Sequence, residues 1–109
     1  MEIVFRDENL RKLCESERYA VKQLGSPCAE KLKIRISDIF AASNVRELPS
    51  GRPHALEGKR KGQYAVELHG GLRLIFVAAN QPTPLVGKDN VDWSRVTKIK
   101  IIEVEDYHA

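Results

Sequence analysis

The chain has 109 residues, of which 42% are hydrophobic and 30% charged, and a formal net charge of +3. This length supports one domain with a single modest core, which we place over residues 1–109. The composition excludes a disordered chain, and the longest apolar run, Leu74 to Ala79, is far below the roughly 18 residues that a membrane span needs. The start of the chain has no secretory signal pattern, so we expect a cytoplasmic protein.

The N-terminal part of the chain is predicted to form a strand followed by a helix. Residues 2–5 (EIVF) are an apolar, extended run. Asp7 is a favourable N-cap, and apolar residues then recur at helical spacing to about Arg18. Residues 19–24 either continue this helix or begin another. The segment 25–27 (GSP) ends it, because glycine and proline both interrupt a helix.

A second helix is predicted from about Cys28 to Ala42. Its apolar residues fall three or four positions apart, so they form one face that would pack on a flat partner. The residues expected on this buried face are Ala29, Leu32, Ile36, Ile39 and Phe40. Those expected to face the solvent are Glu30, Lys31, Lys33, Arg35 and Asp38.

The C-terminal half is predicted to supply the flat partner as an antiparallel sheet. Residues 63–68 and 72–77 are extended runs joined by 69–71 (HGG), whose glycines permit the positive φ of a tight hairpin. Residues 96–104 (VTKIKIIEV) form the last strand, and the polar stretch 80–95 is predicted to be a loop. Two helices packed on a small antiparallel sheet make a two-layer α+β fold.

Polar residues on these strands are candidates for chemistry. Arg73 alternates with Leu72 and Leu74, so it should point away from their core face. If the last strand runs straight, Tyr107 lies on one face of the sheet. The other face then carries Ile102, Val104, Asp106 and His108. One bulge would exchange these faces.

Positive charge is concentrated in one segment. Residues 46–62 hold an excess of three positive charges, which equals the net charge of the whole chain. A basic patch is expected of a protein that binds phosphates, although a solvated, lysine-rich loop would have the same composition. The cations of this segment are Arg46, Arg52, Lys59, Arg60 and Lys61.

The two cysteines do not have the spacing of a metal site. Cys14 and Cys28 form no CxxC pair and are not accompanied by a histidine at ligand spacing. We expect both to be reduced, unreactive thiols, and we expect no metal or other cofactor.

Three blocks of residues resemble one known family. HALEGKRKGQY (54–64) is followed by GLRLIF (71–76) in the predicted hairpin and by EDYH (105–108) after the last strand. Their order and placement resemble the HigB toxins, a branch of the RelE/ParE superfamily of bacterial toxin–antitoxin systems, whose pattern is close to HPLKGxRxGxW, NWRIxF and YEDYH. The resemblance implies a RelE/ParE-like toxin fold over nearly the whole chain.

The same resemblance implies a ribosome-dependent endoribonuclease that cuts translated messenger RNA and so inhibits translation. In such an enzyme the 2′-hydroxyl of the RNA attacks the adjacent phosphate, so neither a metal nor a covalent enzyme intermediate is required. The protein removes one proton, supplies another and stabilises the charge that develops on the phosphate.

Carried over by position, the resemblance assigns a role to each candidate residue. His108 is the first candidate for proton transfer, and His54 would assist it or contact a phosphate. Arg73 would stabilise the phosphate, Tyr107 would stack on a base, and Asp106 would orient an imidazole or the RNA. The residues expected to hold the RNA or ribosomal backbone are Arg52, Lys59, Arg60 and Lys61.

The chain departs from the family pattern at two notable places. Glu57 stands where the family commonly has lysine, so an anion replaces a cation near the phosphate unless Lys59 takes over that role. The stretch 80–95 is longer than the usual turn. It holds the only tryptophan, Trp93, which would either bind a partner or clasp the core.

Two other functions remain open. A ParE-like protein of the same fold would inhibit DNA gyrase, although such a toxin has no need of the DYH block. A catalytically inactive binding module is favoured only by Glu57. If the chain is a nuclease toxin, it requires a cognate antitoxin, in this family a small helix-turn-helix (HigA-like) protein. The complex would then bind operator DNA through the antitoxin.

Overall fold

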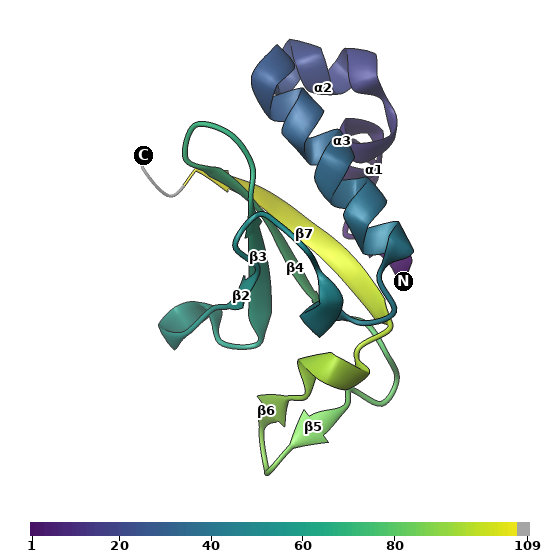
Figure 1. The fold of residues 1–109 in the computed structure, drawn as a ribbon, viewed down its shortest axis with the longest axis vertical. Coiled ribbons are helices and arrows are strands. Elements are labelled where there is room, and N and C mark those ends of the chain that lie inside the picture. Colours follow the sequence, from purple (N-terminus) through teal and green to yellow (C-terminus); the bar gives the residue numbers. More distant parts are fainter. Residues whose placement is uncertain (107–109) are drawn as a thin grey trace.

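The structure, a computed structural model, describes residues 1–106. Within them, three helices cover one face of a five-stranded sheet, and a small two-stranded sheet projects at one end (Figure 1). This arrangement confirms the predicted two-layer α+β fold. The helices are α1 (Glu8–Glu15), α2 (Glu17–Leu24) and α3 (Ser26–Ala41), with short 3-10 helices η1 (Val45–Glu47), η2 (Gly58–Arg60) and η3 (Trp93–Arg95). The strands are β1 (Glu2–Phe5), β2 (His54–Ala55), β3 (Gln63–Glu67), β4 (Leu72–Ala78), β5 (Leu85–Val86), β6 (Asn90–Val91) and β7 (Lys98–Asp106).

The first helical segment breaks in two at Ser16. The backbone amide of Ser16 closes α1, and its hydroxyl accepts a hydrogen bond from the amide of Tyr19 and opens α2. Residues 19–24 therefore belong to a new helix. Asp7 caps α1 as predicted, since its carboxylate accepts from the amide of Leu10 at 2.9 Å. This hydrogen bond lowers the pKa of Asp7.

The five-stranded sheet has the order β1-β7-β4-β3-β2. β1 runs parallel to β7, and the other neighbouring strands are antiparallel. The register between β4 and β7 shifts after Ile75, which leaves Ile102 as an extra residue of β7. Ile101 and Val104 consequently both pack beneath the helices, whereas Ile102 packs on the other face. The alternation of a straight strand, which would place Ile102 with Val104, does not hold because this bulge exchanges the faces.

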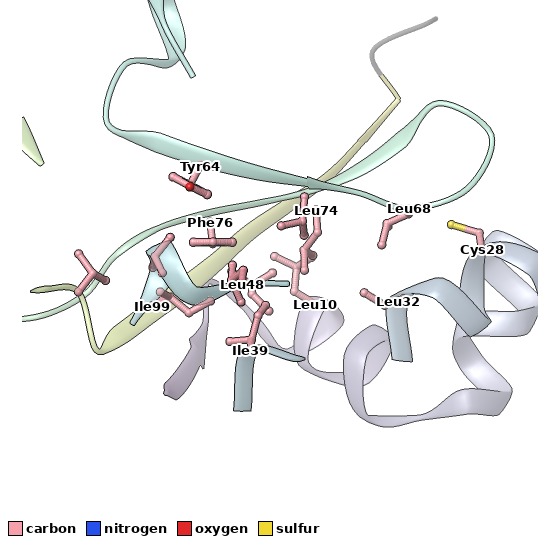
Figure 2. Packing of buried hydrophobic residues seen from close by; sticks show 14 of the residues in the cluster. Leu10, Cys28, Leu32, Ile39, Leu48, Tyr64, Leu68, Leu74, Phe76 and Ile99 are labelled. Carbon is pink, nitrogen blue, oxygen red and sulfur yellow. The ribbon is translucent and has the colours of Figure 1, made fainter. Parts of the chain in front are cut away.

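The main core lies between the helices and the sheet, as Figure 2 shows. Trp93 closes one end of this core, with its ring centroid 4.7 Å from that of Tyr64 and 6.4 Å from that of Phe76. Trp93 therefore clasps the core. The stretch 80–95 is not the simple loop that was predicted, because it contains the β5–β6 hairpin and the 3-10 turn that carries Trp93. Other core residues are Leu10, Leu32 and Ile39 from the helices and Leu74 and Ile99 from the sheet.

The outer surface of α3 differs from the prediction at two residues. Arg35, predicted to face solvent, is 8% exposed. Its Nε donates to the carbonyl of Glu67 at 2.8 Å, and its Nη1 donates to the hydroxyl of Ser50 at 3.1 Å. Phe40, predicted to be buried, is 64% exposed, because the buried stripe ends on Ile39, about 100° around the helix from it. Arg35 thus ties α3 to the loop before β2 and to the end of β3.

Glycine is required at position 51 for two reasons. The φ of Gly51 is +86°, in the left-handed region, and an added Cβ would collide with the guanidinium of Arg35. We expect Gly51→Ala to lower the free energy of unfolding by about 2–4 kcal/mol, measured by urea denaturation. Gly62→Ala is the matched control, because Gly62 has a φ of +91° and nothing within 4 Å of an added Cβ. It should lose only about 1–2 kcal/mol, and equal losses would exclude the collision with Arg35.

Candidate active site

The face of the sheet that is turned away from the helices carries a row of charges across three strands. Arg73 lies in register between Glu67 of β3 and Glu105 of β7. Leu72 and Leu74, its neighbours in β4, belong to the core on the helix side, so the predicted direction of Arg73 is confirmed. The Nε of Arg73 donates to Oε2 of Glu105 at 2.6 Å, and the side chain is only 15% exposed. This ion pair holds Arg73 in a defined orientation.

Arg60, from η2, reaches the same face. Its Nη2 lies 2.9 Å from Oε1 of both Glu103 and Glu105, and its Nη1 donates to Gln63 at 2.7 Å. The hydrogen bond to Glu103 raises the pKa of Arg60. Burial by itself would raise the pKa of Glu105, but the hydrogen bonds and charges of Arg73 and Arg60 hold it below its ordinary value. Glu105 is therefore ionised at neutral pH and joins two guanidinium groups.

His54 lies at the edge of the sheet, in β2. It is opposite Ala65 of β3, which packs with Ile75 on the face that carries Arg73. The Nδ1 of His54 is 2.8 Å from the carbonyl oxygen of Arg52. Because a carbonyl only accepts, Nδ1 carries the proton and the neutral ring keeps its lone pair on Nε2. This is the tautomer that a general base acting through Nε2 requires.

The residue that accepts this hydrogen bond has an unusual backbone. Arg52 has a φ of 49°, the one left-handed residue other than glycine within residues 1–106. Such a conformation costs about 1–2 kcal/mol and persists where the surrounding structure holds it. Here the neighbouring carbonyl of Gly51 accepts from the amide of Glu67 at 2.7 Å. β2 and β4, the strands that carry His54 and Arg73, are separated by β3 and lie about 10 Å apart across the sheet.

The predicted basic patch is largely neutralised by carboxylates from other parts of the chain. Arg52 pairs with Glu67 at 3.5 Å, and Lys61 pairs with Asp89 at 3.4 Å. Lys59 is exposed and makes no ion pair with any other described residue. The acidic members of the site that the sequence analysis missed are Glu67, Glu103 and Glu105. The available signal was the Glu-x-Glu spacing of 103 and 105, which places both carboxylates near one face of a strand.

Asp106 lies on the helix side of the sheet, away from Arg73. In register it is opposite Leu72, and it lines an open pocket of about 410 Å³ between β7 and the helices α1 and α2. Tyr107 and His108 lie outside the described residues. The candidate residues that the structure brings to the face opposite the helices, or to its edge, are Arg52, His54, Arg60 and Arg73.

Residues 1–106 include His, Cys, Asp and Glu side chains, which are the usual protein ligands of metal ions. No group of three His, Cys, Asp or Glu side chains within this range is arranged to hold a metal ion. Burial raises the pKa of the Cys14 thiol to about 12, so this thiol stays protonated at neutral pH. Over the same residues, no helix combines the length and the hydrophobicity that crossing a membrane requires.

Comparison with known proteins gives matches in structure and none in sequence. No protein-family model matches the chain, and no curated protein matches its sequence. A solved YoeB/ParE toxin from Agrobacterium tumefaciens is similar, with 12% identity and a TM-score of 0.58 over 98% of this chain and 99% of that chain. The chain has the fold of the YoeB and ParE toxins.

Two further structures share this toxin fold. One belongs to the YoeB-YefM complex from Staphylococcus aureus, with 16% identity and a TM-score of 0.59. The other is a YoeB dimer from the same organism, with 18% identity and a TM-score of 0.56. Each match covers 100% of this chain and 98% of the other. The RelE/ParE-like fold implied by the sequence blocks is therefore confirmed, while the low identities leave the branch and the activity to be argued from the site.

Proposed function

We propose that this protein is the toxin of a type II toxin–antitoxin system and that it cuts messenger RNA on the ribosome. The observation that carries the proposal is the pair of guanidinium groups, Arg60 and Arg73, held on one face of a toxin fold with His54 at its edge. The sequence blocks that supply these residues follow the HigB pattern. We therefore assign the chain to the HigB branch.

The geometry fits cleavage by attack of the 2′-hydroxyl on the adjacent phosphate. Arg73 and Arg60 neutralise the charge that grows on the phosphate as the new P–O bond forms. His54, protonated on Nδ1, accepts the hydroxyl proton at Nε2 or hydrogen-bonds the phosphate. This reaction yields a 2′,3′-cyclic phosphate and a 5′-hydroxyl, and it consumes no water. It also needs no metal.

The remaining roles rest on the sequence resemblance alone. His108 is our first candidate for proton transfer, either to the 5′ leaving oxygen or from the 2′-hydroxyl. Tyr107 would stack on a base of the messenger, and Asp106 would orient an imidazole or the RNA. Contacts to the RNA or ribosomal backbone would come from Arg52, Lys59 and Lys61.

A toxin of this kind needs a partner that blocks it. One structure with the same fold comes from a complex of YoeB with YefM. We propose that this chain likewise binds a cognate antitoxin, a small helix-turn-helix protein of the HigA type, and that operator DNA is bound through the antitoxin.

One observation favours a second candidate function. The arginines of the site are paired with Glu67, Glu103 and Glu105, so this cluster carries little net positive charge. Inhibition of DNA gyrase by protein–protein contact, as in the ParE branch, would not need a basic face. The terminal DYH block still favours the nuclease.

The deciding experiment adds the purified chain to an in vitro translation reaction with a defined message. Primer extension maps cuts in the message, and the same reaction without ribosomes is the control. Cuts that appear only with ribosomes support the proposal. An uncut message with normal translation contradicts it, and inhibition of DNA supercoiling in a gyrase assay would then establish the alternative.

A further inference from the structure

At the candidate site, the guanidinium groups are already paired with carboxylates. Three arginines reach it, namely Arg52, Arg60 and Arg73, and they pair with three glutamates, namely Glu67, Glu103 and Glu105. The guanidinium nitrogens that would meet a phosphate are thus already in contact with anions. An RNA phosphate that binds there must either displace a carboxylate from the guanidinium N–H groups or bind next to that carboxylate.

The two glutamates that contact Arg60 differ in what they do. Glu105 uses one oxygen for Arg60 and the other for Arg73, so it links the two cations and sets their separation. Glu103 is 38% exposed and pairs with Arg60 at the open side of the cluster. Without Glu103, Arg60 would still be held by Glu105 and Gln63. Glu103 is therefore the anion that can be removed while the arrangement of the cations stays in place.

We propose that Glu103 is a specificity-determining residue that weakens the binding of free single-stranded RNA to the Arg60–Arg73 face. This inference rests on the proposed function, because it concerns what the proposed RNA site accepts. Glu103 competes with phosphate for the Nη2 of Arg60 and repels the phosphate that replaces it. RNA then binds productively only where further contacts, such as those on a ribosome, add to the affinity.

The competition has a specific thermodynamic signature. When RNA binds to a cation whose counterion is salt, that ion is released, and the logarithm of the affinity falls with the logarithm of the salt concentration by about 0.7 per phosphate contact for a single strand. An arginine already paired with a carboxylate releases fewer salt ions. Removing Glu103 should therefore both tighten RNA binding and steepen its salt dependence.

The test measures fluorescence anisotropy of a short, labelled 2′-O-methyl RNA, which the proposed reaction cannot cut. Wild type, Glu103→Gln and the matched control Glu30→Gln are compared between about 50 and 200 mM salt. Glu30 is an exposed residue of α3, which packs on the other face of the sheet, and its substitution changes the net charge by the same amount. We expect Glu103→Gln to bind about tenfold more tightly at low salt, with a salt slope steeper by about 0.7, and Glu30→Gln to match wild type.

A second pair of variants, Arg60→Gln with and without Glu103→Gln, tests whether Glu103 acts through Arg60. In an Arg60→Gln background, Glu103→Gln should bring no gain, and circular dichroism checks that each variant is folded. Equal binding by Glu103→Gln and wild type, an equal gain in Glu30→Gln, or a gain that survives Arg60→Gln would each overturn the proposal. This binding assay involves neither ribosomes nor cleavage. Failure of the chain to cut messages would therefore refute the proposed function without changing the outcome of this test.

Discussion

Replacing Arg73 by alanine is expected to lower the rate of ribosome-dependent cleavage by about 10²–10³-fold, the usual loss when one fixed donor to a developing anion is removed. The reason is geometric. Arg73 is 15% exposed and held by Glu105 at 2.6 Å, so it offers a preorganised charge that solvent cannot replace. Initial rates from primer extension at a single cut site measure the effect.

Two further variants make the Arg73 result specific. Arg73→Lys keeps the charge but loses the planar fork, so it should recover only part of the activity. Arg11→Ala is the matched control, because Arg11 is an exposed arginine of α1 that pairs with Glu8 and Glu15. It should cleave like wild type. Full activity in a folded Arg73→Ala variant would show that Arg73 takes no part in cleavage and would contradict the proposed mechanism.

Replacing Arg35 by methionine is expected to lower the free energy of unfolding by about 2–3 kcal/mol. The aliphatic part of the side chain is kept, but the carbonyl of Glu67 and the hydroxyl of Ser50 lose their buried donor. Hydrogen bonds from a charged donor contribute about 1.5–3 kcal/mol each, and the one to the carbonyl of Glu67 is the larger loss because it is partly buried whereas Ser50 is exposed to water. Urea denaturation followed by circular dichroism measures the change.

The matched control for this prediction is Arg18→Met. Arg18 is exposed on α2 and makes no ion pair with the other described residues, so the substitution should change the free energy of unfolding by less than about 0.5 kcal/mol. Equal stabilities of Arg35→Met and Arg18→Met would show that the loop at Ser50 is held by other contacts. The loop also carries Arg52 and precedes His54, so we expect a folded Arg35→Met variant to lose cleavage activity as well.

Features that depend on neighbours in the sequence were predicted correctly. The first strand, the helix N-cap at Asp7 and the glycine-containing hairpin each follow from residues within a few positions of one another. The direction of Arg73 also follows, because alternation along a single strand needs no knowledge of the rest of the fold. The three sequence blocks led to the correct toxin fold because each is a short run of consecutive residues, although the first one extends from β2 through η2 to the start of β3.

Features that depend on distant partners were not predictable in this way. Arg35 was expected to face solvent because it is charged, yet it lies three residues after Leu32 and four before Ile39, on the buried side of α3. It is accommodated there because the carbonyl of Glu67 in β3 and the hydroxyl of Ser50, 15 residues later in the chain, accept its hydrogen bonds. The cations of 46–62 look like a basic patch in the composition, yet Arg60 meets Glu103 and Glu105, more than 40 residues away in the chain. Tertiary contacts decide both cases.

The sequence by itself thus determined the class of the fold, its main helices and strands, and the residue types available for chemistry. Only the tertiary structure decided which faces those residues share and what charge they present. The bulge in β7 is the clearest example, because one extra residue puts Val104 and Asp106 on the helix side together with Ile101 and so places Asp106 away from Arg73. The physical reason is that strand periodicity is a local property, whereas register and ion pairing depend on which strands the fold brings side by side.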